Sequence, residues 1–283
     1  MSTIEVMPAR LTREETEDLS RAVACLGGTS FAQRLTDAIG RPLGMVSRTL
    51  PESARRAIAH TSETALRGAL KLALRTIDLN ASAKAGNRAH KLAAAFSGAL
   101  GGAFGFAALP VELPISTTIL LRSIAEIARE EGEDLNAPNA ALACVEVLAL
   151  GGRPDEEAAF ESGYFAVRAA LARSVSDSAR FVAEQGLGAQ SAPVVARLIS
   201  QIAARFGVVV SEKLAAQAAP ILGAIGGATV NAAFADHFQT LARGHFIVRR
   251  LERAHGPSLV AFEYQRLRGE RARGGLEQRR AAS

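Results

Sequence analysis

Three ionisable side chains stand in settings that could support acid–base chemistry. Glu112 lies between Pro110 and Pro114, directly after twenty uncharged residues. His237 and His245 are eight residues apart, so within a helix they can share one face. A carboxylate and an imidazole within hydrogen-bonding reach of a substrate can act as general acid and base. A hydrolase site at these three residues is therefore one hypothesis, provided that they converge in a cleft.

Each of these side chains also has a plain structural interpretation. Glu112 is typical of the start of a helix near Pro114, because the helix dipole attracts acids to its N-terminus. If Glu112 is instead buried without a partner, its pKa rises and it becomes the leading candidate for a functional carboxylate. With Asp236, the two histidines could form a weak metal site or be ordinary, partly exposed side chains. His60 and Glu63, three residues apart, offer the same alternatives.

No short motif fixes a reaction. The chain lacks Gly-x-Ser-x-Gly, a phosphate-binding loop and His-Glu-x-x-His. Its two cysteines, Cys25 and Cys144, are too few for a four-cysteine zinc site, and Cys144 lies in an apolar run typical of a buried side chain. We therefore expect no metal and no cofactor, and a protein that is not an enzyme is favoured over the hydrolase.

The elements that must position these residues are predicted to be helices. Of the 283 residues, 48% are apolar but only 5% are aromatic, and none is Trp. Ala, Leu and Gly therefore dominate the core, which favours close helix packing over a β-sandwich. We expect an all-α fold: one compact multi-helix domain at 48–256, an N-terminal helical extension at 1–47, and a basic C-terminal helix with a frayed tail at 257–283.

Helix-start and helix-stop signals recur along the chain. Thr12 to Glu15 forms a capping box, Asn136 can cap a helix, and Gly132 follows the end of one. A break is expected across 110–114. The predicted helices lie at about 13–26, 30–39, 52–79, 88–109, 114–131, 137–150, 155–172, 174–185, 192–206, 209–219, 220–243, 245–254 and 258–273.

Two glycine-rich apolar helices are expected to cross at the centre of this domain. Glycine four residues from glycine allows two helix backbones to approach closely. Each glycine in a helix interior costs about 1 kcal/mol relative to Ala, so several together indicate a compensating contact. A buried Asn beside them needs a hydrogen-bond partner and would help to specify the crossing. The predicted crossing residues are Gly98, Gly101, Gly102 and Gly105 in the first helix, and Gly223, Gly227 and Asn231 in the second.

The twenty uncharged residues at 92–111 leave three interpretations open. They can form a buried core helix, an element on a membrane surface, or a spanning helix, since twenty residues span about 30 Å. Only seven of them are large and apolar, and each favours insertion by only about 0.3 to 0.6 kcal/mol. A buried core helix is therefore favoured.

The charge of the chain is concentrated near its C-terminus. Residues 243–283 contain ten Arg and four Glu, a net charge of +6. Such a tail can attract anionic lipid, at about 1 kcal/mol per arginine near the surface, or it can simply be solvated. Nucleic acid is disfavoured, because no aromatic platform accompanies the arginines. The first 25 residues lack the apolar run of a signal peptide, so a cytoplasmic location is expected.

Residues 98–152 carry a family resemblance. The element Leu109-Pro110-Val111-Glu112-Leu113-Pro114, preceded by glycine-rich residues, resembles the hallmark of the EcsC protein family. The family commonly has Asp where this chain has Glu112. The second glycine segment, at 220–231, and Arg249-Arg250-Leu251 are similar to the family's C-terminal half. The resemblance covers about 48–256.

The resemblance implies little about chemistry. The family is bacterial and is named for a gene beside the two components of an ATP-binding-cassette transporter. It has no established catalytic mechanism or cofactor, and the peptidase label on some members cannot be transferred without a site. We expect an accessory or interaction protein, peripheral on the inner membrane face, with membrane lipid or a transporter component as its partner.

Overall fold

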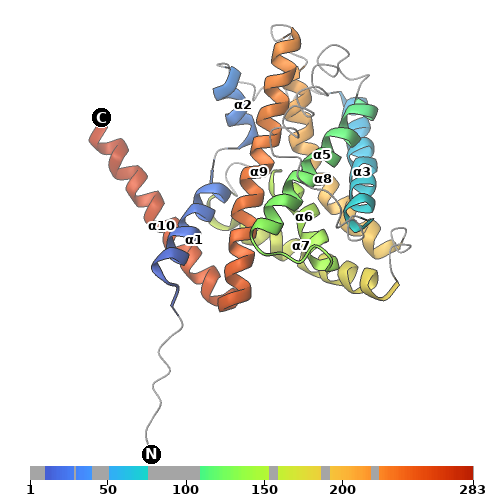
Figure 1. Ribbon diagram of the computed structural model, residues 1–283. Coiled ribbons are helices and arrows are strands. Elements are labelled where there is room, and N and C mark those ends of the chain that lie inside the picture. The colour runs from blue at the N-terminus through green and yellow to red at the C-terminus, as the bar shows by residue number, and fades with distance from the viewer. Residues whose placement is uncertain are drawn as a thin grey trace, which may run out of the picture. The chain divides into compact units, whose positions relative to one another are not determined.

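The computed structural model describes nine α-helices and, within the described residues, no strand (Figure 1). The all-α prediction is confirmed. The chain divides into two compact units, one formed by residues 1–28 with 243–283 and one by residues 29–242. The described residues are 10–28, 30–39, 51–75, 109–152, 159–185, 192–217 and 223–282.

The larger unit is built around a helix that is buried on every side. This central helix, α6 (Pro138–Leu150), is buried at each position from Ala140 onward. It packs against α3, α5, α7 and α8, and α3 also packs against α5 and α8. The helices of this unit are α2 (Phe31–Ile39), α3 (Glu52–Arg75), α5 (Leu109–Glu130), α6, α7 (Ala159–Gln185), α8 (Pro193–Gln217) and the first part of α9 (Gly223–His255).

Four phenylalanines join α2, α8 and α9 within this unit. Phe234 stacks edge-on against Phe31 and Phe238, with ring centroids 5.7 and 5.1 Å apart. Phe206 of α8 lies 6.0 Å from Phe234 and 5.7 Å from Phe238. All four are buried, so they form one aromatic cluster in the core of the larger unit.

The smaller unit contains α1 (Arg13–Leu26), the last part of α9 and α10 (Pro257–Ala282). The predicted capping box is confirmed. The Glu15 N–H donates to Thr12 Oγ1 at 3.2 Å, and the Thr12 N–H donates to Glu15 Oε2 at 2.8 Å. Gly256, with φ of +86°, allows the turn from α9 into α10, which begins at Pro257.

Several predicted boundaries are wrong, because the helices continue where breaks were expected. Helix α5 begins at Leu109 and includes Pro114. The first N–H groups of a helix have no intrahelical acceptor, so Pro110 costs no hydrogen bond and Pro114 costs only one. The expected pairs 155–172 with 174–185, 192–206 with 209–219, and 220–243 with 245–254 are the single helices α7, α8 and α9.

The predicted signals around α6 are partly confirmed. Gly132 has φ of +75°, the left-handed conformation that ends α5. The cap at Asn136 is wrong, because the N-cap is Ala137 and no side chain caps the helix. Asn136 instead donates from its backbone and its amide to Asp134 Oδ1, both at 3.0 Å.

Among the described residues, one helix is long and apolar enough to cross a membrane, judged by length and composition alone. This is α8, which packs against α3, α6 and α7, and core helices of globular proteins meet the same criterion. The predicted helix at 88–109 and most of the uncharged run at 92–111 lie outside the described residues.

Candidate functional site

Glu112 forms a buried ion pair with Lys213. The Lys213 Nζ lies 2.7 Å from Glu112 Oε1, and both side chains are almost fully enclosed. The ammonium also lies 4.8 Å from the centre of the Phe234 ring. The pair therefore ties the first turn of α5 to α8, with an aromatic face completing the surroundings of the cation.

The sequence contains a signal that identifies Lys213, although motif reasoning missed it. On α8, buried residues recur at alternating steps of three and four, the spacing of one helix face. A lysine on such a face must either reach solvent or find a buried partner. The face consists of Ile199, Ile202, Phe206, Val209, Lys213 and Ala216.

Burial lowers the pKa of Lys213 below its ordinary value, and the Glu112 carboxylate acts in the opposite direction. The expected capping role of Glu112 is wrong, because α5 begins three residues before it and its carboxylate bonds Lys213. The condition for a functional carboxylate, burial without a partner, is also not met. Glu112 is therefore buried and paired across two helices, and its role as a functional carboxylate stays a prediction.

The two histidines of the hydrolase hypothesis are buried rather than exposed to solvent. His237 is buried in the larger unit, with ring centroids 5.4 Å from Phe31 and 5.2 Å from Phe238. His245 is fully buried in the smaller unit beside Phe246. Glu112 is bonded to Lys213 and both histidines are buried, so the structure shows no exposed acid–base pair formed by these three residues within their own units.

The suggested metal ligands have other contacts. Asp236 accepts from Arg34 Nη1 at 2.8 Å. Glu63 accepts from Arg67 Nη2 at 2.5 Å and from Ser200 Oγ at 3.4 Å, and the Arg67 hydrogen bond lowers the pKa of Glu63. Within the part of the chain that the structure describes, no three His, Cys, Asp or Glu side chains form a group that could hold a metal ion.

The structure describes only some of the residues predicted to form the glycine crossing. Gly98, Gly101, Gly102 and Gly105 lie outside the described residues. Gly223 begins α9, and Gly227 and Asn231 are buried on it. The crossing of the two glycine helices therefore stays a prediction.

A buried carboxylate, Glu146, and a half-buried one, Glu212, were not expected from the sequence. Glu146 is the single charge in the enclosed part of α6. Glu212, next to Lys213, is bound to the backbone of Ala32 in the first turn of α2. Burial raises the pKa of Glu212 to about 7, although the hydrogen bond to Ala32 acts in the other direction.

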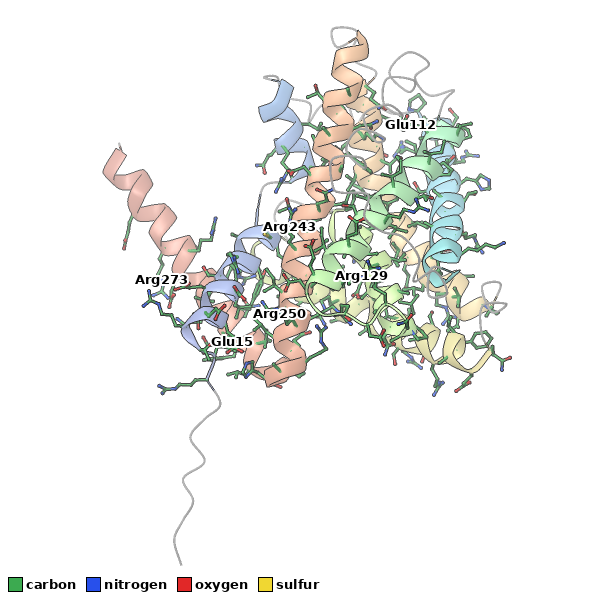
Figure 2. The ribbon with its side chains drawn as sticks, viewed as in Figure 1. Glu15, Glu112, Arg129, Arg243, Arg250 and Arg273 are labelled. Atoms are coloured by element: carbon green, nitrogen blue, oxygen red, sulfur yellow. The ribbon has the colours of Figure 1, made fainter. Side chains whose placement is uncertain are left out.

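Helix α5 leaves an apolar patch exposed at its N-terminal end. Val111 is 66% exposed and Ile115 is 47% exposed, and they lie one turn apart on the same face. Pro110 beside them is also exposed. Arg122 and Arg129 lie farther along this face and are also exposed. Figure 2 shows Glu112 near one end of α5 and Arg129 near the other. The face therefore changes from apolar to cationic along the helix.

In the smaller unit, acidic residues of α1 pair with basic residues of α9. Asp18 accepts from Arg250 at 2.5 Å and also from Arg21. Burial alone would raise the pKa of Asp18, but these two arginines hold it below its ordinary value. Glu15 lies 2.6 Å from His255 Nε2, and this contact is the largest of the effects that lower the pKa of Glu15 to about 2.

Helix α10 continues to Ala282, and the frayed tail stays a prediction. A seven-residue repeat explains the persistence of the helix: Glu263, Glu270 and Glu277 recur with Arg266, Arg273 and Arg280. Arg266 pairs with Glu263 and with Glu270, each at 2.7 Å. Such pairs at three- and four-residue spacing stabilise an exposed helix. Arg271 and Arg273 are exposed on the same stretch.

The comparisons with known proteins identify one family. Searches of curated proteins and of solved structures find no match. The model of the EcsC protein family matches residues 27–251, which include Glu112 and Lys213 and most of the described helices. The chain therefore belongs to the EcsC protein family.

Proposed function

We propose that this EcsC-family chain is a non-enzymatic accessory protein that binds peripherally to the inner face of the bacterial membrane. The observation that carries the proposal is the arginine-rich second half of α10, in which Arg271 and Arg273 are exposed. Of the net charge of the whole chain, +5, residues 243–283 alone supply +6. Each arginine near an anionic bilayer contributes about 1 kcal/mol to the free energy of binding, so several together give measurable attachment.

The hydrolase alternative is weaker on this geometry. A general acid or base must reach the proton that it transfers. Glu112 is 6% exposed and bonded to Lys213, and His237 is 5% exposed. The link to transport or secretion rests on the family resemblance alone, and a transporter component that copurifies with the chain would support it.

Sedimentation with lipid vesicles tests the proposal. The full chain is expected to pellet with vesicles that contain phosphatidylglycerol, and less with vesicles of phosphatidylcholine alone. Replacing Arg271 and Arg273 by Gln should weaken the anionic binding. Replacing Arg173 and Arg180, exposed arginines of α7, is the matched control and should change it less. A chain that stays in the supernatant with both kinds of vesicle would overturn the proposal.

A further inference from the structure

We propose that the insertion face of α5, formed by Pro110, Val111 and Ile115, enters the outer part of a lipid bilayer. This inference rests on the proposed membrane function and assigns the residues of the larger unit that touch lipid. Val111 and Ile115 are the two most exposed large aliphatic side chains among the described residues, and they are neighbours on one helix face. Two adjacent exposed aliphatic side chains indicate a contact surface more strongly than isolated ones.

The spacing between Ile115 and Arg122 matches the depth of the bilayer interface. At 1.5 Å per residue, Ile115 and Arg122 are separated by about 10 Å along α5. Interfacial helices bury their apolar surface about 5–10 Å into the boundary between headgroups and acyl chains. With the N-terminal end of α5 inserted, Arg122 would lie at the level of the headgroup phosphates.

This end of α5 carries no unpaired charge and has one backbone donor fewer than an ordinary helix start. The one ionisable side chain of the first turn, Glu112, points into the core and is paired with Lys213. Pro110 has no N–H, so one of the donors that a helix start leaves open does not exist here. Insertion therefore buries no unpaired charge and fewer unsatisfied donors than an ordinary helix start.

A bilayer fits this face better than a second copy of the chain or a protein groove. In the sequence, Pro110 and Val111 end a run of twenty uncharged residues, 92–111. Exposed arginines follow on the same side of the helix, at Arg122 and Arg129. An apolar end followed by cations complements acyl chains followed by anionic headgroups.

The natural absence of Trp makes a direct test possible. Val111→Trp places a single fluorophore in the insertion face, and Ile115→Trp repeats the measurement if the first variant folds poorly. Arg129→Trp is the matched control, on the same face but about 27 Å from Val111 along the helix. Each full-length variant is mixed with phosphatidylglycerol vesicles in which a share of the lipid has brominated acyl chains, and pelleting is measured in parallel.

The expected result is a shift of the emission of the Trp at 111 and at 115 to shorter wavelength, with quenching that grows with bromine content. The Trp at 129 should show neither. If the variants pellet but the Trp at 111 and at 115 is not quenched, the inference is overturned while the proposed function stands. If no variant pellets, both fail. An emission shift that depends on protein concentration without lipid would instead identify a second copy as the occupant and overturn the inference.

Discussion

At the scale of single residues, the buried charges decide how firmly the larger unit is held together. Removing one member of a buried ion pair leaves an uncompensated charge and typically costs about 3–5 kcal/mol, whereas replacing both by apolar residues is often neutral. The pair of Glu112 and Lys213 has this character, because both side chains are enclosed and joined at 2.7 Å.

Lys213→Met should therefore lower the free energy of unfolding by about 3–5 kcal/mol, because the Glu112 carboxylate stays buried without its partner. The double variant Glu112→Leu with Lys213→Met should recover most of that loss. Urea denaturation of the three proteins measures both quantities. A single variant as stable as the parent would show that the pair is not closed in solution.

Glu212 gives the larger unit a predictable dependence on pH. Its pKa in the folded chain is raised to about 7, above the ordinary value of 4.5, because the carboxyl group is buried. The folded state therefore binds the proton more tightly than the unfolded state, and this contribution to stability is fully present below pH 4.5. It is lost as the pH rises through about 7.

Glu212→Gln should flatten this part of the stability profile and raise the free energy of unfolding at pH 8 by about 1–3 kcal/mol, since the amide cannot ionise. Denaturation midpoints at pH 5 and pH 8 measure the slope. Glu184→Gln, at an exposed position of α7, is the control and should leave the slope unchanged. An unaltered slope in Glu212→Gln would contradict the assignment.

At the scale of helices, the sequence predicts most elements but misplaces their ends. The capping box at Thr12 and the glycine after α5 are local signals, and both are confirmed. The break expected across 110–114 is wrong, because α5 runs through both prolines, of which Pro110 costs no hydrogen bond and Pro114 costs one. Contacts across the fold, such as Glu112 with Lys213, 101 residues apart, have no local signature beyond the core spacing of α8.

The approach of the α6 end to α8 gives a test of element packing. A Cβ on Gly152 would clash with the backbone carbonyl of Arg205. Gly152→Ala should therefore lower the free energy of unfolding by several kcal/mol, and the melting temperature should fall with it. Gly163→Ala in α7 is the matched control, because its Cβ would meet nothing within 4 Å. It should stabilise the helix by up to about 1 kcal/mol.

The ion pairs of Arg266 with Glu263 and Glu270 predict that this part of α10 is helical in solution. Arg266→Ala removes both pairs at once, so amide hydrogen exchange across 263–273 should become severalfold faster. Gln265 is exposed and takes no part in these ion pairs, so Gln265→Ala should leave the exchange rates nearly unchanged. Equal exchange in both variants would show that the pairs do not hold the helix.

At the scale of the whole molecule, composition was enough to predict an all-α fold, and the motif around Glu112 was enough to indicate the family. The role of Glu112 was not predictable, because its partner lies on another helix and only packing brings them together. The exposure of Val111 and Ile115 was not predictable either, since the same apolar spacing is typical of a buried helix face.

The most direct test of the central claim, peripheral attachment to a membrane, is fractionation of bacterial cells that express the full chain. The chain is expected in the membrane fraction. A high-salt wash should release part of it, because salt screens the arginines of α10, and detergent should release the rest, because apolar contacts persist when charges are screened. Val111→Ser with Ile115→Ser should make the chain fully releasable by salt. A chain found wholly in the soluble fraction before any wash would contradict the claim.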